Sequence, residues 1–125
     1  MAVLWVALGS ALGGAARFLV GSALQRVAGA GFPVATLVIN VTGSFALGVL
    51  ARLAADGGGV GPSARLFLAV GVCGGYTTFS TFSLEAVELL QRGRLGSAGA
   101  YVAGSVLLSL VAVAAGSAAA RGGAP

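Results

Sequence analysis

The stretch Gly-Gly-Tyr-Thr-Thr-Phe-Ser-Thr-Phe, at residues 74–82, decides the fold of this chain. It lies in an apolar segment long enough for a helix, yet two glycines followed by β-branched threonines make a poor helix interior. We therefore expect the helix to break here. Irregular backbone at membrane depth persists only where it is buried in protein or lines a polar cavity. If the segment crosses a membrane, the break marks a candidate functional site.

The main chain and the hydroxyls at the break offer one kind of ligand. Main-chain carbonyls that are freed near Gly74 and Thr77 could bind a small cation, because hard cations prefer oxygen ligands. The hydroxyls of Ser80 and Thr81 are placed to cap the helix where it resumes. This part of the sequence therefore predicts a broken helix with a candidate cation site.

Two phenylalanines offer a second kind of ligand. Phe79 and Phe82 lie three residues apart and should point the same way. Since an aromatic ring is positive at its edge, two such edges could receive an anion within an apolar pore, although such a pair also suits lipid contact or core packing. Glu85 and Glu88 follow, either as a carboxylate pair for proton transfer or as a solvated face at a pore mouth.

The composition identifies an integral membrane protein. Of the 125 residues, 58% are hydrophobic and 8% are charged, and the mean hydropathy is +1.02. Soluble domains carry about 25% charged residues, and a soluble fold of this size could not hide so much apolar surface from water. The same numbers exclude intrinsic disorder.

The charged residues divide the chain into membrane spans. A spanning helix needs about 20 predominantly apolar residues; the first uncharged run reaches that length only if it continues through Arg17 to about Leu24. We predict an all-α integral membrane protein with one domain over residues 1–125, whose third helix is broken mid-membrane. The four predicted spans lie near 3–24, 33–53, 65–91 (interrupted) and 97–120.

The arginines outside the spans are balanced between the two sides of the membrane. Cytoplasmic loops normally carry the excess of Lys and Arg, but here three arginines fall on each side. A single misplaced boundary would produce this tie artificially. Otherwise the chain inserts both ways up and pairs with itself as a dual-topology antiparallel homodimer. The two sets are Arg52, Arg65 and Arg121, and Arg26, Arg92 and Arg94.

Arg17 and Asn40 are polar residues within predicted spans. An arginine near the centre of a span costs about 2.5–3.5 kcal/mol, so Arg17 either snorkels to the nearby end of its helix or serves an anion vestibule or an inter-helix junction. Asn40 shares a helix face with Thr36 and Ser44. That face either joins two helices through hydrogen bonds or offers amide donors to a dehydrated anion.

The fourth span and the glycines complete the pattern. Tyr101, Ser105 and Ser109 recur every four residues as one polar stripe on an apolar helix. Small residues mark close helix packing in membranes, and we expect this role for most of the glycines in the spans. These are Gly9, Gly13, Gly14, Gly21, Gly43, Gly48, Gly71, Gly74 and Gly75.

Several function classes are disfavoured. The chain has no histidine and no lysine, and Cys73 is its only cysteine. These absences remove the usual metal ligand sets, an internal disulfide and imidazole acid–base chemistry, so we do not expect an enzyme. The arginines are scattered singly between apolar runs, and we therefore expect no nucleic-acid partner.

Taken together, these motifs resemble the CrcB/Fluc family of fluoride channels over essentially the whole chain. The string at 74–82 is the most specific part of the likeness, and it is preceded by Gly13-Gly14 with Arg17-Phe18 and by a second motif. That motif reads Phe32-Pro33-x-x-Thr36-Leu37-x-x-Asn40-x-x-Gly43-Ser44-Phe45. Two positions depart from the family pattern, Phe18 in place of a common tyrosine and Ala35 in place of a common glycine.

The resemblance implies an antiparallel homodimer with two narrow fluoride pores, located in the plasma or inner membrane of the cell. Such a homodimer exports fluoride passively and so relieves fluoride toxicity. It also implies a structural sodium ion at the two-fold axis, held by the carbonyls of Gly74 and Thr77 from each subunit. Arg17 would attract anions at the vestibule. The residues implied along the ion path are Phe79, Phe82, Asn40, Ser80, Thr81, Tyr101, Ser105 and Ser109.

Two other functions are alternatives to a fluoride channel. A small four-span, dual-topology multidrug exporter would call for a carboxylate in the first span, but no acidic residue precedes Asp56. A purely structural membrane subunit would leave the string at 74–82 without a purpose.

Overall fold

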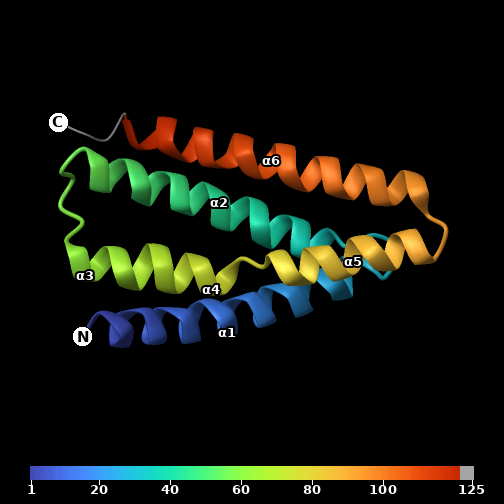
Figure 1. The fold of residues 1–125 in the computed structure, drawn as a ribbon, viewed down its shortest axis with the longest axis horizontal. Coiled ribbons are helices and arrows are strands. Elements are labelled where there is room, and N and C mark those ends of the chain that lie inside the picture. Colours follow the sequence, from blue (N-terminus) through green and yellow to red (C-terminus); the bar gives the residue numbers. More distant parts are fainter. Residues whose placement is uncertain (122–125) are drawn as a thin grey trace.

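Four long helical segments, which we call rods, lie side by side in the computed structural model (Figure 1). The structure describes residues 1–121. The first, second and fourth rods are each one helix. The third rod is divided into four pieces. The helices are α1 (Ala2–Ala28), α2 (Val34–Ala55), α3 (Pro62–Arg65), η1 (Leu66–Cys73), α4 (Gly74–Tyr76), α5 (Phe79–Gln91) and α6 (Leu95–Arg121).

Each rod is long and apolar enough to cross a membrane, which confirms the prediction of an all-helical fold with four long apolar helices. The rods alternate in direction, so the loop after α2 lies at the same end as the N-terminus and the end of α6, and the other two loops lie at the opposite end (Figure 1). The two sets of three arginines therefore lie near opposite ends of the bundle, as predicted. The dual-topology homodimer stays a prediction.

The helices extend a few residues beyond the predicted spans because local backbone chemistry, rather than hydropathy, ends them. α1 continues to Ala28 and stops at Gly29, whose φ of 75° glycine adopts without a steric penalty. Gly93 ends the third rod in the same way, with a φ of 74°. Pro33 is the N-cap of α2, and Pro62 occupies the first turn of α3.

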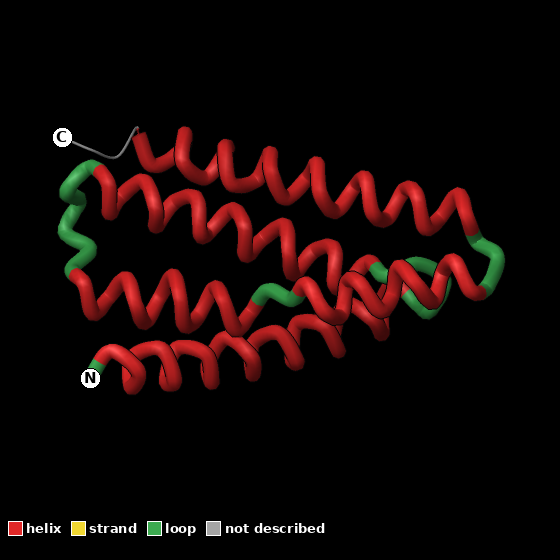
Figure 2. The backbone as a smooth tube through the Cα atoms, viewed as in Figure 1, coloured by secondary structure: helices red, strands yellow, loops and turns green. Residues whose placement is uncertain are grey.

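The third rod breaks where the sequence predicts. Thr77 and Thr78 are extended, with ψ angles of 157° and 116°, and they form the short loop between α4 and α5 (Figure 2). Before the break the helix widens, because η1 is π-helical and the amide of Gly74 donates to the carbonyl of Ala69, five residues earlier. Wide turns of this kind are often found at functional sites.

The predicted cap of α5 is wrong. Ser80 and Thr81 lie in the first turn of the helix, and the N-cap is Thr78, whose hydroxyl accepts a hydrogen bond from the amide of Thr81. The extended stretch ends at Thr78, so this residue is the one whose side chain can reach the amide three residues further on.

Glycines allow the helices to approach closely. A Cβ atom at Gly13 would lie 2.8 Å from the amide nitrogen of Tyr76, and one at Gly9 would lie 2.8 Å from the Cα of Gly71, so α1 packs directly on η1 and α4. Gly14 is an exception within the single chain, because a Cβ there would meet no atom within 4 Å. Further close glycine contacts occur at Gly43, Gly48, Gly75 and Gly116.

Candidate functional site

The side chain of Asn40 holds the break in the third rod. Its Nδ2 donates to the carbonyl of Thr78 at 3.0 Å, and its Oδ1 accepts from the amide of Thr78 at 2.8 Å. One amide side chain thus satisfies both main-chain groups of an extended residue within the bundle. Because an amide carries two N–H donors, the second N–H of Asn40 is not used by Thr78.

These bonds deprive two carbonyls of their helical partners. In a continuous helix the amide of Thr78 would donate to the carbonyl of Gly74, and the amide of Thr81 would donate to the carbonyl of Thr77. Here the first amide donates to Asn40 and the second to the hydroxyl of Thr78. Carbonyl oxygens without helical donors are suitable ligands for a hard cation, so the geometry at Gly74 and Thr77 fits such an ion.

A cavity of about 270 Å³ lies beside the break, between α2, η1, α4 and α6. It brings together residues that are widely separated in the sequence, including five of the predicted site residues. Those five are Asn40, Gly74, Thr77, Phe79 and Ser109. Phe82, Tyr101 and Ser105 are buried in the core, and Arg17 and Thr81 line a second cavity. Ser80 lines neither cavity and is exposed in the first turn of α5 in the single chain, so the structure does not bring it to the others.

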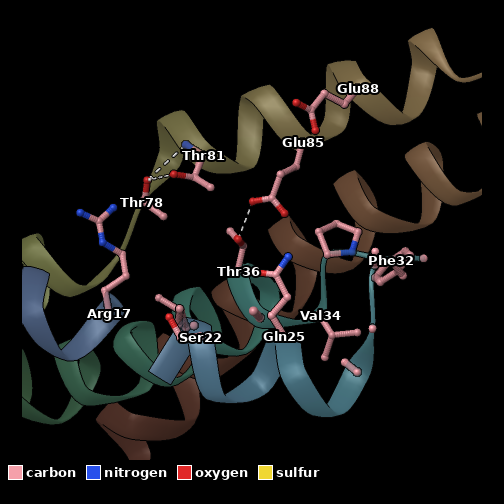
Figure 3. A pocket seen from close by; sticks show the side chains of 18 of the residues that line it. Arg17, Ser22, Gln25, Phe32, Val34, Thr36, Thr78, Thr81, Glu85 and Glu88 are labelled. Atoms are coloured by element: carbon pink, nitrogen blue, oxygen red, sulfur yellow. Dashed lines mark hydrogen bonds between the residues drawn. The ribbon is translucent and has the colours of Figure 1, made fainter. Parts of the chain in front are cut away.

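The second cavity, of about 610 Å³, lies between α1, α2, α5 and the loop that follows α1 (Figure 3). Thr78 lines both cavities, so the break forms part of the wall between them. We call the larger cavity the vestibule. Its polar and charged lining consists of Arg17, Ser22, Gln25, Thr36, Thr78, Thr81, Glu85, Glu88 and Arg92.

Arg17 lies on the vestibule wall rather than at a helix end. α1 continues for eleven residues beyond it to Ala28, a distance of about 16 Å at 1.5 Å per residue. This distance argues against snorkelling and favours the vestibule interpretation. The one ion pair among residues 1–121 joins Arg52 to Asp56, so Arg17 presents a positive charge to the cavity that no carboxylate within that range pairs.

The two glutamates line the vestibule from α5, and their role at a pore mouth stays a prediction. Glu85 points toward α2, where the hydroxyl of Thr36 donates to its Oε1 at 2.5 Å (Figure 3). Glu88 lies one turn further along the same helix. The bond from Thr36 connects α2 to α5 across the cavity.

Aromatic rings form a chain from the break into the core. The ring centroids of Phe79 and Phe82 are 5.6 Å apart, and those of Phe82 and Tyr101 are 5.2 Å apart. Phe32 meets Tyr101 edge-on at 5.5 Å and 83°. The two phenylalanines are neighbours as predicted but differ in environment, because Phe79 is 79% exposed in the single chain and Phe82 only 9%.

The polar stripe of α6 is buried and partly without partners. Tyr101 is completely buried and Ser105 is nearly so, and within residues 1–121 neither hydroxyl has a hydrogen-bond partner. An unsatisfied buried polar group costs about 1–3 kcal/mol, and such groups in a native structure call for an explanation such as a bound ion or water. Ser109, the third residue of the stripe, reaches the smaller cavity.

Sequence reasoning missed two contributors to this site. Thr78 caps α5 and lines both cavities, yet the two adjacent threonines of the string are indistinguishable in the sequence alone. Phe32 belongs to the second quoted motif but was given no role. Its contact with Tyr101 joins residues 69 positions apart, so local spacing carries no signal for it.

Comparison with known proteins identifies the family of this chain. Residues 4–117 match the family described as CrcB-like protein, Camphor Resistance (CrcB). The chain belongs to this family. It is therefore a multi-pass membrane protein, and the resemblance seen in the sequence is confirmed.

Relatives from several bacteria match the CrcB-like chain along most of its length. A protein of Nitrobacter winogradskyi is 53% identical over 114 residues, which cover 91% of this chain and 90% of the relative. One of Rhodospirillum centenum is 53% identical over 108 residues, 86% of each chain. One of Cereibacter sphaeroides is 51% identical over 121 residues, 96% and 94% of the two chains. All three are named as a fluoride-specific ion channel.

Proposed function

We propose that this chain forms a passive, fluoride-selective channel that lets fluoride leave the cell across the plasma or inner membrane and so relieves its toxicity. The observation that carries the proposal is a pair of buried hydroxyls without partners among the described residues. One belongs to Tyr101, whose ring packs against Phe82, and the other to Ser105, one turn further along α6. Its relatives in the family carry the name of a fluoride-specific ion channel, which supports the same function.

The physics of fluoride suits this pathway. Fluoride is small and strongly hydrated, so a pore must replace its water with closely spaced donors. Hydroxyl protons can rotate toward an anion, and the positive edges of aromatic rings add to their attraction. A path narrow enough for these contacts penalises the larger chloride ion sterically.

Arg17 gives the vestibule a local positive charge. The whole cavity is of mixed sign, because Arg92, Glu85 and Glu88 also line it, but a positive charge beside a low-dielectric wall raises the concentration of anions in its own neighbourhood. Anions entering the vestibule would next meet Thr78 at the break and Phe79 on its far side.

A structural sodium ion and an antiparallel homodimer belong to the proposal. The carbonyls of Gly74 and Thr77 would hold the ion. When bound, its positive charge would offset the negative ends of the carbonyl dipoles and hold the broken helices together. Two carbonyls are too few for a hard cation, and Gly74 is exposed in the single chain, so a second copy would complete the site. The balance of three arginines at each end supports insertion in both orientations.

Ion efflux from liposomes that contain the purified protein tests the function. A fluoride electrode should record rapid fluoride release without a proton gradient, and the paired chloride-loaded liposomes should release little. The multidrug exporter and the structural subunit both predict no fluoride release under these conditions. No release of either ion from protein that is shown to be folded would contradict the channel.

Removing the unpartnered hydroxyls should separate function from stability. We expect Tyr101→Phe and Ser105→Ala each to slow fluoride efflux by about tenfold, because a hydrogen bond to a charged group contributes about 1.5–3 kcal/mol. The melting temperature should stay the same or rise, because each change deletes a buried group that has no protein partner. A lower melting temperature with unchanged efflux would mean that these hydroxyls serve only the fold.

A further inference from the structure

Helix α4, which precedes the break, is also bound to α2, through the side chain of Tyr76. The hydroxyl of Tyr76 lies 3.0 Å from the Oγ1 of Thr42. Thr42 has a single hydroxyl proton, and its Oγ1 lies 2.7 Å from the carbonyl of Val38 as donor. The hydroxyl of Tyr76 is therefore the donor in the bond to Thr42.

Tyr76 is enclosed by bare backbone on both sides. A Cβ at Gly43 of α2 would lie 3.0 Å from the ring atom Cδ1 of Tyr76, and it would lie closer still to the methyl group of Thr77. On the opposite side, a Cβ at Gly13 of α1 would lie 2.8 Å from the amide nitrogen of Tyr76. The ring thus crosses Gly43, and its hydroxyl ends at Thr42.

The break therefore has an anchor on each side, and both anchors come from α2. Asn40 binds the main chain of Thr78 on the α5 side, and Thr42 binds the side chain of Tyr76 on the α4 side. The peptide groups whose carbonyls lack helical donors lie between these anchors or next to them. Their orientation depends on how firmly both ends are held.

We propose that Tyr76 and Thr42 form a positioning pair that aims the carbonyls of Gly74 and Thr77 at a bound cation, an inference that rests on the sodium site of the proposed function. The pair touches neither the ion nor the fluoride path. An ion-binding site needs its ligand atoms held within about 0.5 Å of the positions they take around the bound ion. Without the pair, the carbonyls would have to be ordered when the ion binds, and the affinity for sodium would fall.

Sodium-dependent stability tests this pair independently of ion conduction. The melting temperature of the purified full-length protein is measured over a range of sodium chloride concentrations, with choline chloride keeping the ionic strength constant. Four proteins are compared: the unaltered chain, Tyr76→Phe, Thr42→Val and the matched control Thr42→Ser, which retains the hydroxyl. Tyr76→Phe removes only the donor and keeps the ring on Gly43.

We expect the sodium midpoint to rise about 3- to 10-fold in Tyr76→Phe and in Thr42→Val, the size expected for the loss of one hydrogen bond. Thr42→Ser should stay near the unaltered protein. The double variant Tyr76→Phe/Thr42→Val should shift no further than either single variant, because both remove the same bond. At saturating sodium, the melting temperatures and the fluoride efflux rates should converge with those of the unaltered protein.

The possible failures are distinguishable. An unaltered protein whose melting temperature ignores sodium would overturn the sodium site, and the positioning pair with it. If the unaltered protein responds but Tyr76→Phe has the same midpoint, the pair alone is overturned. A uniform drop in melting temperature at every sodium concentration, with no change of midpoint, would likewise show that the bond serves only the fold.

Discussion

Replacing Phe82 by isoleucine should slow fluoride efflux by about tenfold or more, since about 1.4 kcal/mol of lost contact with the ion corresponds to a tenfold effect. Phe82 is buried between Phe79 and Tyr101, with its centroid 5.2 Å from that of Tyr101. Isoleucine retains most of the apolar volume but has no electropositive ring edge. The loss should therefore fall on the ion far more than on the fold.

Efflux from liposomes measures this effect, and Phe67→Ile is the matched control. Phe67 packs edge-on against Trp5 at 6.4 Å and does not belong to the chain of rings formed by Phe79, Phe82 and Tyr101. It should lose some stability and little efflux. Phe79→Ile should also slow efflux strongly, although Phe79 is mostly exposed in the single chain, because it lines the smaller cavity beside Asn40. Unaltered efflux in both Phe79→Ile and Phe82→Ile would remove the phenylalanines from the ion path.

Replacing Gly13 by alanine should destabilise the protein severely, whereas the same change at the adjacent Gly14 should be tolerated. A Cβ at Gly13 would lie 2.8 Å from the amide nitrogen of Tyr76 and closer still to the carbonyl oxygen of Val72. Both neighbours are backbone atoms, so α1 itself must move away. Overpacking typically costs about 1–3 kcal/mol and occasionally more, and a clash with backbone atoms of two residues, Val72 and Tyr76, places this change at the upper end.

The measurement is the yield of folded protein after detergent extraction, together with its melting temperature. Gly14→Ala is a close control, because it makes the same chemical change one residue along the same helix, where a Cβ would meet no atom within 4 Å. Equal losses in the two variants would show that helix propensity or insertion, rather than contact with η1 and α4, governs α1. Gly14 faces the vestibule, so stability rather than efflux is the relevant readout.

The sequence alone predicted the four spans, the break and the balance of arginines because these are local properties. Hydropathy is summed over about 20 neighbouring residues, and the poor helix propensity of the glycines and threonines belongs to those residues themselves. In the structure, the third rod is accordingly interrupted at Thr77 and Thr78, within the motif at residues 74–82. The helix ends differed by a few residues, since Gly29 ends α1 and apolarity does not.

The tertiary structure alone decided how the break is held and what surrounds it. Asn40 meets Thr78 across 38 positions, and Thr36 meets Glu85 across 49. No spacing rule relates residues so far apart, because their contact depends on how whole helices pack. The same packing turned Arg17 into the vestibule and left the hydroxyls of Tyr101 and Ser105 buried without partners. The sequence determined which groups enter the membrane, and only the packing of four helices determined which of them meet there.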